Sequence, residues 1–131
     1  MILLDTQAAA WLATRPQRLS RPAAEAVRRQ VGRDGLSIAS VTLMELAQML
    51  ASGEIRPAGT PREWLRGFVG TTGASIRELT VDIAAVAAHL SPDFPGDPFD
   101  RVIAATAIVE KLPLVTSDSR IRESQVVRTI W

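Results

Sequence analysis

The sequence contains no cysteine and a single histidine, His89, and each shortage removes a class of chemistry. Without cysteine, disulfide bonds and thiolate catalysis are excluded. With one imidazole, tetrahedral zinc sites built from several cysteine and histidine ligands are excluded too. No partner for His89 stands at ligand spacing, so we expect this residue to be structural. A metal ion in this protein would be held mostly by oxygen atoms.

Long hydrophobic runs are also missing. No stretch of about eighteen uncharged apolar residues occurs, so we expect no membrane span. The N-terminus is apolar, but it includes Asp5 and has no basic stretch before it, which favours a first β-strand over a signal peptide. We therefore expect a cytoplasmic protein.

A strong net charge is the third absence. The 131 residues are 47% hydrophobic and 22% charged, which favours one globular domain spanning 1–131. A net charge of +1 by itself predicts no binding to a polyanion. Between positions 15 and 34, however, six arginines face only two acids, Glu25 and Asp34. This local excess of four positive charges has two open interpretations, a solvated helical face and a surface that follows a phosphate backbone.

Hydrophobic patterning and turn residues predict strands that alternate with helices. We expect strands at 2–4, 36–39, 75–79, 113–116 and 126–130, and helices at 6–13, 22–32, 42–51, 61–70, 81–89 and 98–110, with a short helical turn at 119–123. This alternation is typical of a parallel α/β sheet. Three prolines between 91 and 98 exclude regular helix there, so we expect a loop that delivers Asp97 and Asp100 to the next helix.

Four acids, Asp5, Glu45, Asp100 and Asp118, stand where a buried run or a loop gives way to a helix. In an open α/β sheet, ligands collect beyond the carboxyl ends of the strands, where these side chains would converge. Clustered carboxylates repel one another unless a cation relieves them, and Mg²⁺ suits an all-oxygen site. One or two such ions can promote attack of water on a phosphodiester.

Each acid also has an ordinary structural explanation. Asp5 and Asp118 are positioned to cap the helices that follow them. Thr42 and Glu45 match a capping box, in which Glu45 would satisfy only its own helix start. Asp97 suits an N-cap before Pro98, which leaves Asp100 in a favourable position near the helix dipole. Taken singly these explanations are favoured, but none of them requires the acids to converge.

Several segments resemble one known family over essentially the whole chain. They are Met-Ile-Leu-Leu-Asp-Thr at 1–6, Ser-x-x-x-x-Glu at 40–45, Asp-Pro-Phe-Asp-Arg-Val-Ile-Ala-Ala-Thr-Ala at 97–107, Leu-Pro-Leu-Val-Thr-Ser-Asp at 112–118 and Val-Arg-Thr-Ile-Trp at 127–131. In this order they resemble the PIN-domain family and, more narrowly, the VapC-type toxins of type II toxin–antitoxin systems. The resemblance implies a three-layer α/β/α fold with a central, mostly parallel sheet.

The same resemblance implies an endoribonuclease that depends on Mg²⁺ or Mn²⁺, with RNA as substrate. Asp5 and Asp100 would be the principal metal ligands, Glu45 a further ligand reached directly or through water, and Asp118 the fourth acid. It also implies a homodimer and a cognate VapB-type antitoxin whose tail occupies the groove. Neighbouring groups are expected to support the carboxylates or bound water, namely Thr6, Asp97, Thr116 and Ser117.

Two departures from the family pattern bear on substrate choice and rate. Relatives often carry histidine after the opening Asp-Thr and a His-Arg pair before Asp-Pro, where this chain has Gln7 and Pro95-Gly96. These positions supply no carboxylate, so we expect metal binding to survive. A set of large apolar residues is expected to pack in the core or at its edge, namely Trp11, Trp64, Trp131, Met44 and Met49.

Two other functions are compatible with parts of this pattern. A phosphatase of the haloacid dehalogenase type requires a second aspartate two residues after the first, where this chain has Gln7. The stronger alternative is a non-catalytic PIN-like domain that binds RNA or a protein, with its acids kept for stability. Metal titration and RNA cleavage separate that alternative from a nuclease.

Overall fold

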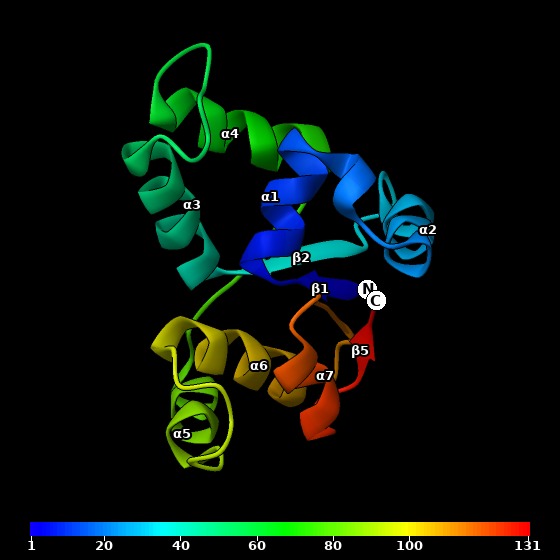
Figure 1. Ribbon diagram of the computed structural model, residues 1–131, viewed down its shortest axis with the longest axis vertical. Helices are drawn as coiled ribbons and strands as arrows, with labels where there is room; N and C mark the ends of the chain where they lie inside the picture. The colour runs from blue at the N-terminus through cyan, green and yellow to red at the C-terminus, as the bar shows by residue number, and fades with distance from the viewer.

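A computed structural model describes all 131 residues. Its centre is a five-stranded sheet in the order β3-β2-β1-β4-β5, and all four strand pairings are parallel (Figure 1). The strands are β1 (Ile2–Leu4), β2 (Leu36–Ala39), β3 (Ser75–Arg77), β4 (Leu114–Val115) and β5 (Thr129–Ile130). The expected α/β sheet is confirmed, and it is parallel throughout.

Seven α-helices and one short 3₁₀ helix cover the sheet. They are α1 (Thr6–Thr14), η1 (Pro16–Arg18), α2 (Arg21–Gln30), α3 (Ser40–Ser52), α4 (Pro61–Thr72), α5 (Val81–His89), α6 (Pro98–Glu110) and α7 (Ser119–Ser124). In Figure 1, helices α1 to α4 lie on one side of β1 and β2, and α5, α6 and α7 lie on the other. The three-layer α/β/α arrangement is therefore confirmed.

The alternation of side chains along β1 divides the core into two. Ile2 and Leu4 pack with residues of α1, α2 and α4, whereas Leu3 packs with α6 and α7 on the opposite face. All three side chains are buried. Because full burial of a leucine stabilises a fold by about 1.5–3 kcal/mol, the central strand is anchored on both faces. It provides a rigid base for the residue that follows it, Asp5.

The expected element bounds differ from the structure in a few places. The strand expected at 75–79 ends at Arg77, and the one expected at 126–130 is reduced to Thr129–Ile130. The 3₁₀ helix at Pro16–Arg18 was not expected. The prediction that Met44 packs was wrong, because 56% of this residue is exposed. Trp11 and Trp131 do pack, with ring centroids 5.8 Å apart.

No helix is both long enough and apolar enough to cross a membrane. His89 lies at the end of α5, where its Nδ1 is 2.8 Å from the carbonyl oxygen of Ala85. This contact with its own helix agrees with a structural role.

Candidate metal centre

The predicted acids meet at the carboxyl edge of the sheet. Asp5 directly follows β1, α3 with Glu45 follows β2, and Asp118 lies three residues beyond β4. Because β1 pairs with both β2 and β4, these chain segments emerge side by side. The resulting cleft has a volume of about 600 Å³.

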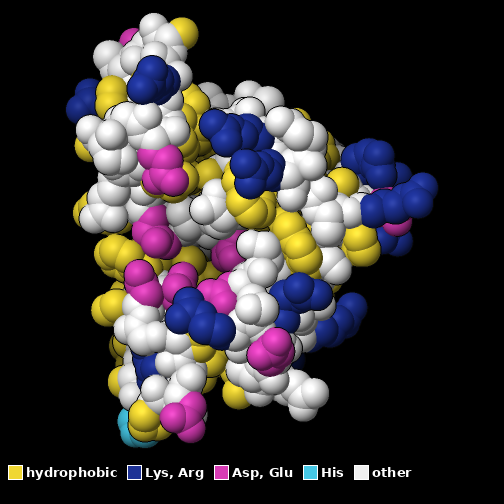
Figure 2. All heavy atoms as spheres, in the orientation of Figure 1, with side chains coloured by type: hydrophobic (Ala, Val, Ile, Leu, Met, Phe, Trp, Pro, Cys, Tyr) yellow, Lys and Arg dark blue, Asp and Glu magenta, His cyan; other side chains and the backbone are white.

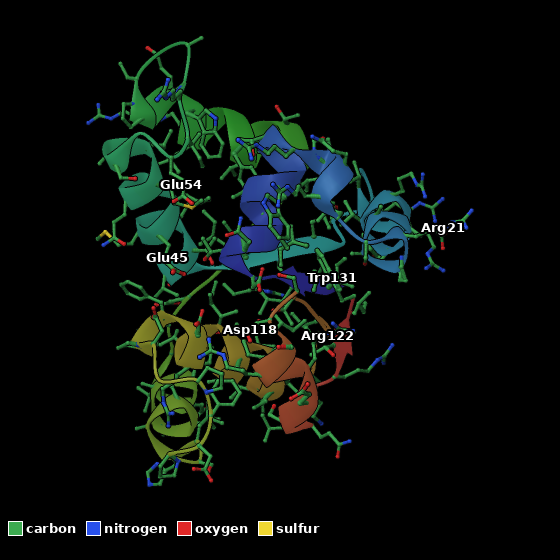
Figure 3. The ribbon with its side chains drawn as sticks, in the orientation of Figure 1. Arg21, Glu45, Glu54, Asp118, Arg122 and Trp131 are labelled. Atoms are coloured by element: carbon green, nitrogen blue, oxygen red, sulfur yellow. The ribbon has the colours of Figure 1, made fainter.

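Six acids and no lysine or arginine line the cleft. The acids are Asp5, Glu45, Glu54, Asp97, Asp100 and Asp118. The acidic side chains gather in a hollow of the surface in Figure 2. Figure 3 places Glu45 on α3 and Glu54 just beyond its end, with Asp118 across from them at the start of α7.

Asp5 caps a helix and faces the cleft at the same time. It is 9% exposed, and its Oδ1 accepts a 2.8 Å hydrogen bond from the backbone N–H of Ala8. The predicted cap of α1 is therefore confirmed. Burial raises the pKa of Asp5 to about 6, with smaller contributions from the charges of Asp100 and Asp118. Interactions with the Thr116 hydroxyl and the Ala8 amide only partly oppose this rise.

Glu45 does not take part in a capping box, so that interpretation was wrong. Helix α3 begins at Ser40, two residues before Thr42, and its N-cap is Ala39, which makes no side-chain capping bond. Glu45 instead accepts a 2.5 Å hydrogen bond from the hydroxyl of Thr6. Burial raises the pKa of Glu45, and the charges of nearby acids add to the effect. The residue is therefore tied to the start of α1 and faces the cleft.

Asp97 and Asp100 lie at the start of α6. Asp97 accepts a 2.8 Å bond from the backbone N–H of Phe99, which confirms the predicted N-cap. Burial raises the pKa of Asp100 to about 6, followed by the charges of Asp97 and Glu45. Carboxylate oxygens of Glu45, Asp97 and Asp100 lie within 4.8 Å of one another. The tightest group thus includes Asp97, which the sequence had suggested only as a supporting residue.

Asp118 differs from the other acids because a cation already contacts it. Its Oδ1 accepts a 2.9 Å bond from the backbone N–H of Arg120, which confirms the predicted cap of α7. The Arg120 guanidinium also binds both carboxylate oxygens, with Nε 3.3 Å from Oδ1 and Nη2 3.1 Å from Oδ2. Burial raises the pKa of Asp118, but the hydrogen bonds and charge of Arg120 outweigh it, so the net pKa is lowered.

The polar residues before Asp118 shape its turn. Thr116 is fully buried, and its hydroxyl accepts a 3.1 Å bond from the backbone N–H of Asp118. Ser117 lines the cleft directly. Gln7 also lines the cleft, whereas Pro95 and Gly96 do not.

Sequence reasoning missed several residues on α3 and just after it. Gln48 and Ser52 of α3, and Glu54 beyond its end, line the cleft. Gln48 and Ser52 lie three and seven positions after Glu45, so they share its helix face. Helical periodicity counted from Glu45 would have found these two.

The donor set fits a hard divalent cation. Every charged group that lines the cleft is a carboxylate, and three of them have raised pKa values because they are buried near one another. At neutral pH their ionised forms repel, and a cation bound among them would relieve this repulsion. Mg²⁺ and Mn²⁺ prefer oxygen ligands of this kind.

Known proteins are similar to this chain in sequence and in fold. The profile of the PIN domain family matches residues 2–126. Ribonuclease VapC22 of Mycobacterium tuberculosis (strain ATCC 25618 / H37Rv) is 38% identical over 135 aligned positions, which cover 99% of this chain and 98% of that protein.

Several solved structures are similar to this chain in fold. One is VapBC2 from Rickettsia felis, whose structure was solved with a DNA fragment from its promoter. It aligns with a TM-score of 0.73 and 16% identity, covering 98% of this chain and 97% of that one. FitAcB from Neisseria gonorrhoeae aligns with a TM-score of 0.71 and 22% identity, covering 98% and 96%. At these identities the structural matches establish the fold alone.

Proposed function

The chain belongs to the PIN-domain family, and on that premise we propose that it is a metal-dependent endoribonuclease, the toxin of a VapBC-type toxin–antitoxin pair. One observation carries the proposal. This chain is similar to a ribonuclease over nearly its full length, and carboxylate oxygens of Glu45, Asp97 and Asp100 lie within 4.8 Å of one another in its acidic cleft.

The metal would be held by carboxylates from three parts of the fold. Asp5 and Asp100 are the proposed principal ligands, with Glu45 and Asp97 as further ligands. Asp118, the fourth acid of the family pattern, lines the same cleft but is paired with Arg120. When bound, Mg²⁺ or Mn²⁺ supplies Lewis-acid stabilisation of the charge that develops on the phosphate and promotes attack by water.

The chain's own residues prepare this site. The Ala8 amide fixes one oxygen of Asp5 at the rigid end of β1. The Thr6 hydroxyl, at the start of α1, orients Glu45 on α3. Because Asp5 and Asp100 have pKa values of about 6, both are mostly ionised at pH 7.5 and increasingly protonated below pH 6. The carboxylates are therefore already oriented and negatively charged for metal binding before RNA binds.

The proposed partners are an RNA substrate, a VapB-type antitoxin and a second copy of the chain. The solved neighbours include VapBC assemblies, which supports an antitoxin partner. Large exposed apolar side chains provide surface for such contacts, namely Met44, Ile76, Leu79 and Val81. We propose that the protein acts in the cytoplasm, because a toxin that cleaves cellular RNA must reach that RNA there.

The decisive experiment is cleavage of a mixed RNA pool by the purified protein. Reactions contain Mg²⁺, Mn²⁺ or EDTA, and an Asp5→Asn variant purified identically is the control. We expect cutting that requires the metal and is lost in the variant. RNA binding with no cutting above the control would instead favour the non-catalytic PIN-like alternative.

A further inference from the structure

Arg120 is the only basic residue that forms an ion pair with an acid of the cleft. The chain has three ion pairs, and the other two, Arg21–Glu25 and Arg77–Glu110, involve no residue of the cleft. Arg120 and Asp118 are joined by two side-chain contacts and one backbone hydrogen bond. In Figure 2, a basic side chain lies against the acidic patch.

This pairing uses both oxygens of Asp118. Because one guanidinium occupies Oδ1 and Oδ2 together, Asp118 already has a cation partner, unlike Asp5, Glu45 and Asp100. A carboxylate in this state must release Arg120 or share its oxygens before it can ligate a metal ion. Asp118 therefore differs from the other acids in that its negative charge is already paired.

The guanidinium, in contrast, is only partly used. Arginine carries five N–H donors, and the pair with Asp118 uses two of them, at Nε and Nη2. The Arg120 side chain remains 68% exposed at the rim. The remaining N–H groups are free to donate to a second acceptor, and the planar fork of arginine suits the oxygens of a phosphate.

We propose that Arg120 contacts a backbone phosphate of the RNA beside the metal centre, and that Asp118 acts mainly as the residue that positions Arg120. This inference rests on the proposed ribonuclease function. Six acids in one cleft repel a polyanion, and an arginine paired with Asp118 beside the cleft lowers that repulsion where the phosphate must approach. The Asp118 carboxylate holds the guanidinium in place at the N-terminus of the same short helix.

The first arm of the test measures metal affinity by titration calorimetry with Mn²⁺. Wild type, Asp118→Asn and Asp100→Asn are compared. We expect Asp118→Asn to bind Mn²⁺ within about threefold of wild type and Asp100→Asn to lose roughly tenfold or more, because Asp100→Asn removes a charged oxygen ligand of the ion. Asparagine is itself a good N-cap, so α7 keeps its start. An equal loss in both variants would make Asp118 a metal ligand and overturn the inference.

The second arm measures RNA binding by fluorescence anisotropy in Ca²⁺, with RNA integrity checked on a gel. Arg120→Gln should bind roughly tenfold more weakly, as for loss of one charge-assisted contact. Arg122→Gln, on the same helix and also exposed, is the matched control and should stay within about twofold of wild type. Arg120→Lys keeps the charge but not the fork, and should be intermediate.

A double-mutant cycle tests the positioning role of Asp118. Asp118→Asn should weaken RNA binding when Arg120 is present and have little effect in the Arg120→Gln background. Equal binding by Arg120→Gln and Arg122→Gln, or additive effects in the cycle, would overturn the inference. Failure of wild type to bind Mn²⁺ would instead remove the proposed metal-dependent function, and the RNA measurements would still decide the role of Arg120.

Discussion

Asp100 shows how a single residue can be unfavourable for folding and useful for binding. Its pKa is raised to about 6 by burial and by the neighbouring acids Asp97 and Glu45. The folded state therefore holds the proton more tightly than the unfolded chain does. Stability is lost as the pH rises from about 4 to above 6, because ionisation costs more in the folded state.

Replacing Asp100 with asparagine should relieve this repulsion. We expect the metal-free Asp100→Asn protein to be about 1 kcal/mol more stable at pH 7.5, after allowing for solvent screening and a small loss of interaction with the α6 dipole. The gain should disappear below pH 4, where Asp100 is neutral in both states. Urea denaturation in EDTA measures this gain in the free energy of unfolding. Asp93→Asn, at an exposed position in the loop before α6, is the control. A clear loss of stability would show that the carboxylate serves mainly the helix start.

The same raised pKa values predict how metal binding depends on pH. Protons compete with the metal at Asp5 and Asp100, both with pKa values of about 6. We expect the affinity for Mn²⁺ to fall roughly tenfold between pH 7.5 and pH 5.5. Calorimetric titrations at the two pH values test this, and an affinity that does not change would mean that these carboxylates either do not bind the ion or are not protonated near pH 6.

At the scale of elements, the loop before α6 depends on one arginine. The Arg101 side chain donates from Nη2 to the Leu90 carbonyl (2.5 Å) and from Nη1 to the Ser91 carbonyl (3.3 Å). Its Nε donates to Ala87 (3.3 Å), and its guanidinium lies 6.0 Å from the ring centroid of Phe94. The end of α5 is thereby tied to α6 and to the loop that leads to the metal centre.

Arg101→Met should therefore loosen that connection. We expect a loss of about 2–3 kcal/mol in the free energy of unfolding, because three carbonyl groups lose a charged donor. Mn²⁺ affinity should fall as well, since the loop carries Asp97 into the site. Arg128→Met, an exposed arginine outside the site, is the control for urea denaturation and titration. If Arg101→Met lost stability but kept its affinity for Mn²⁺, the role of Arg101 would be structural only.

The sequence predicted the acids because their positions follow from topology, whereas their contacts do not. Asp5 directly follows the apolar run that forms β1, and parallel strands bring such ends together. The contact between Glu45 and Thr6 spans 39 positions and has no local signal, whereas the local pattern Thr-x-x-Glu also fitted a capping box that the structure does not form. Strand β2 runs straight into α3, which places the helix start earlier than the pattern suggested. The role of Asp97 in the tightest group depends on the three-dimensional path of the loop before it.

At the scale of the whole molecule, opposite charges are separated despite a net charge of +1. The acids concentrate in the cleft between α3, α6 and α7. The arginines of α2 and the residues after it form a separate surface, the α2 patch, defined by Arg28, Arg29 and Arg33 around Glu25. Figure 3 shows Arg21 of α2 at the far edge of the molecule from Glu45 and Glu54. RNA that enters the cleft therefore meets the acidic region first and the α2 patch only at a distance.

This separation predicts two effects of salt on RNA cleavage. Raising the salt concentration from 50 to 200 mM should raise KM and leave kcat nearly unchanged, because basic groups of the protein that bind RNA phosphates release counterions from them. For short RNAs, replacing Arg28, Arg29 and Arg33 together with glutamine should leave the slope of log KM against log salt unchanged, since these residues lie away from the cleft. Steady-state cleavage of a short RNA at four salt concentrations measures both effects. A smaller slope in the triple variant would show that the α2 patch follows the RNA backbone, and a KM that does not respond to salt would argue against phosphate contacts altogether.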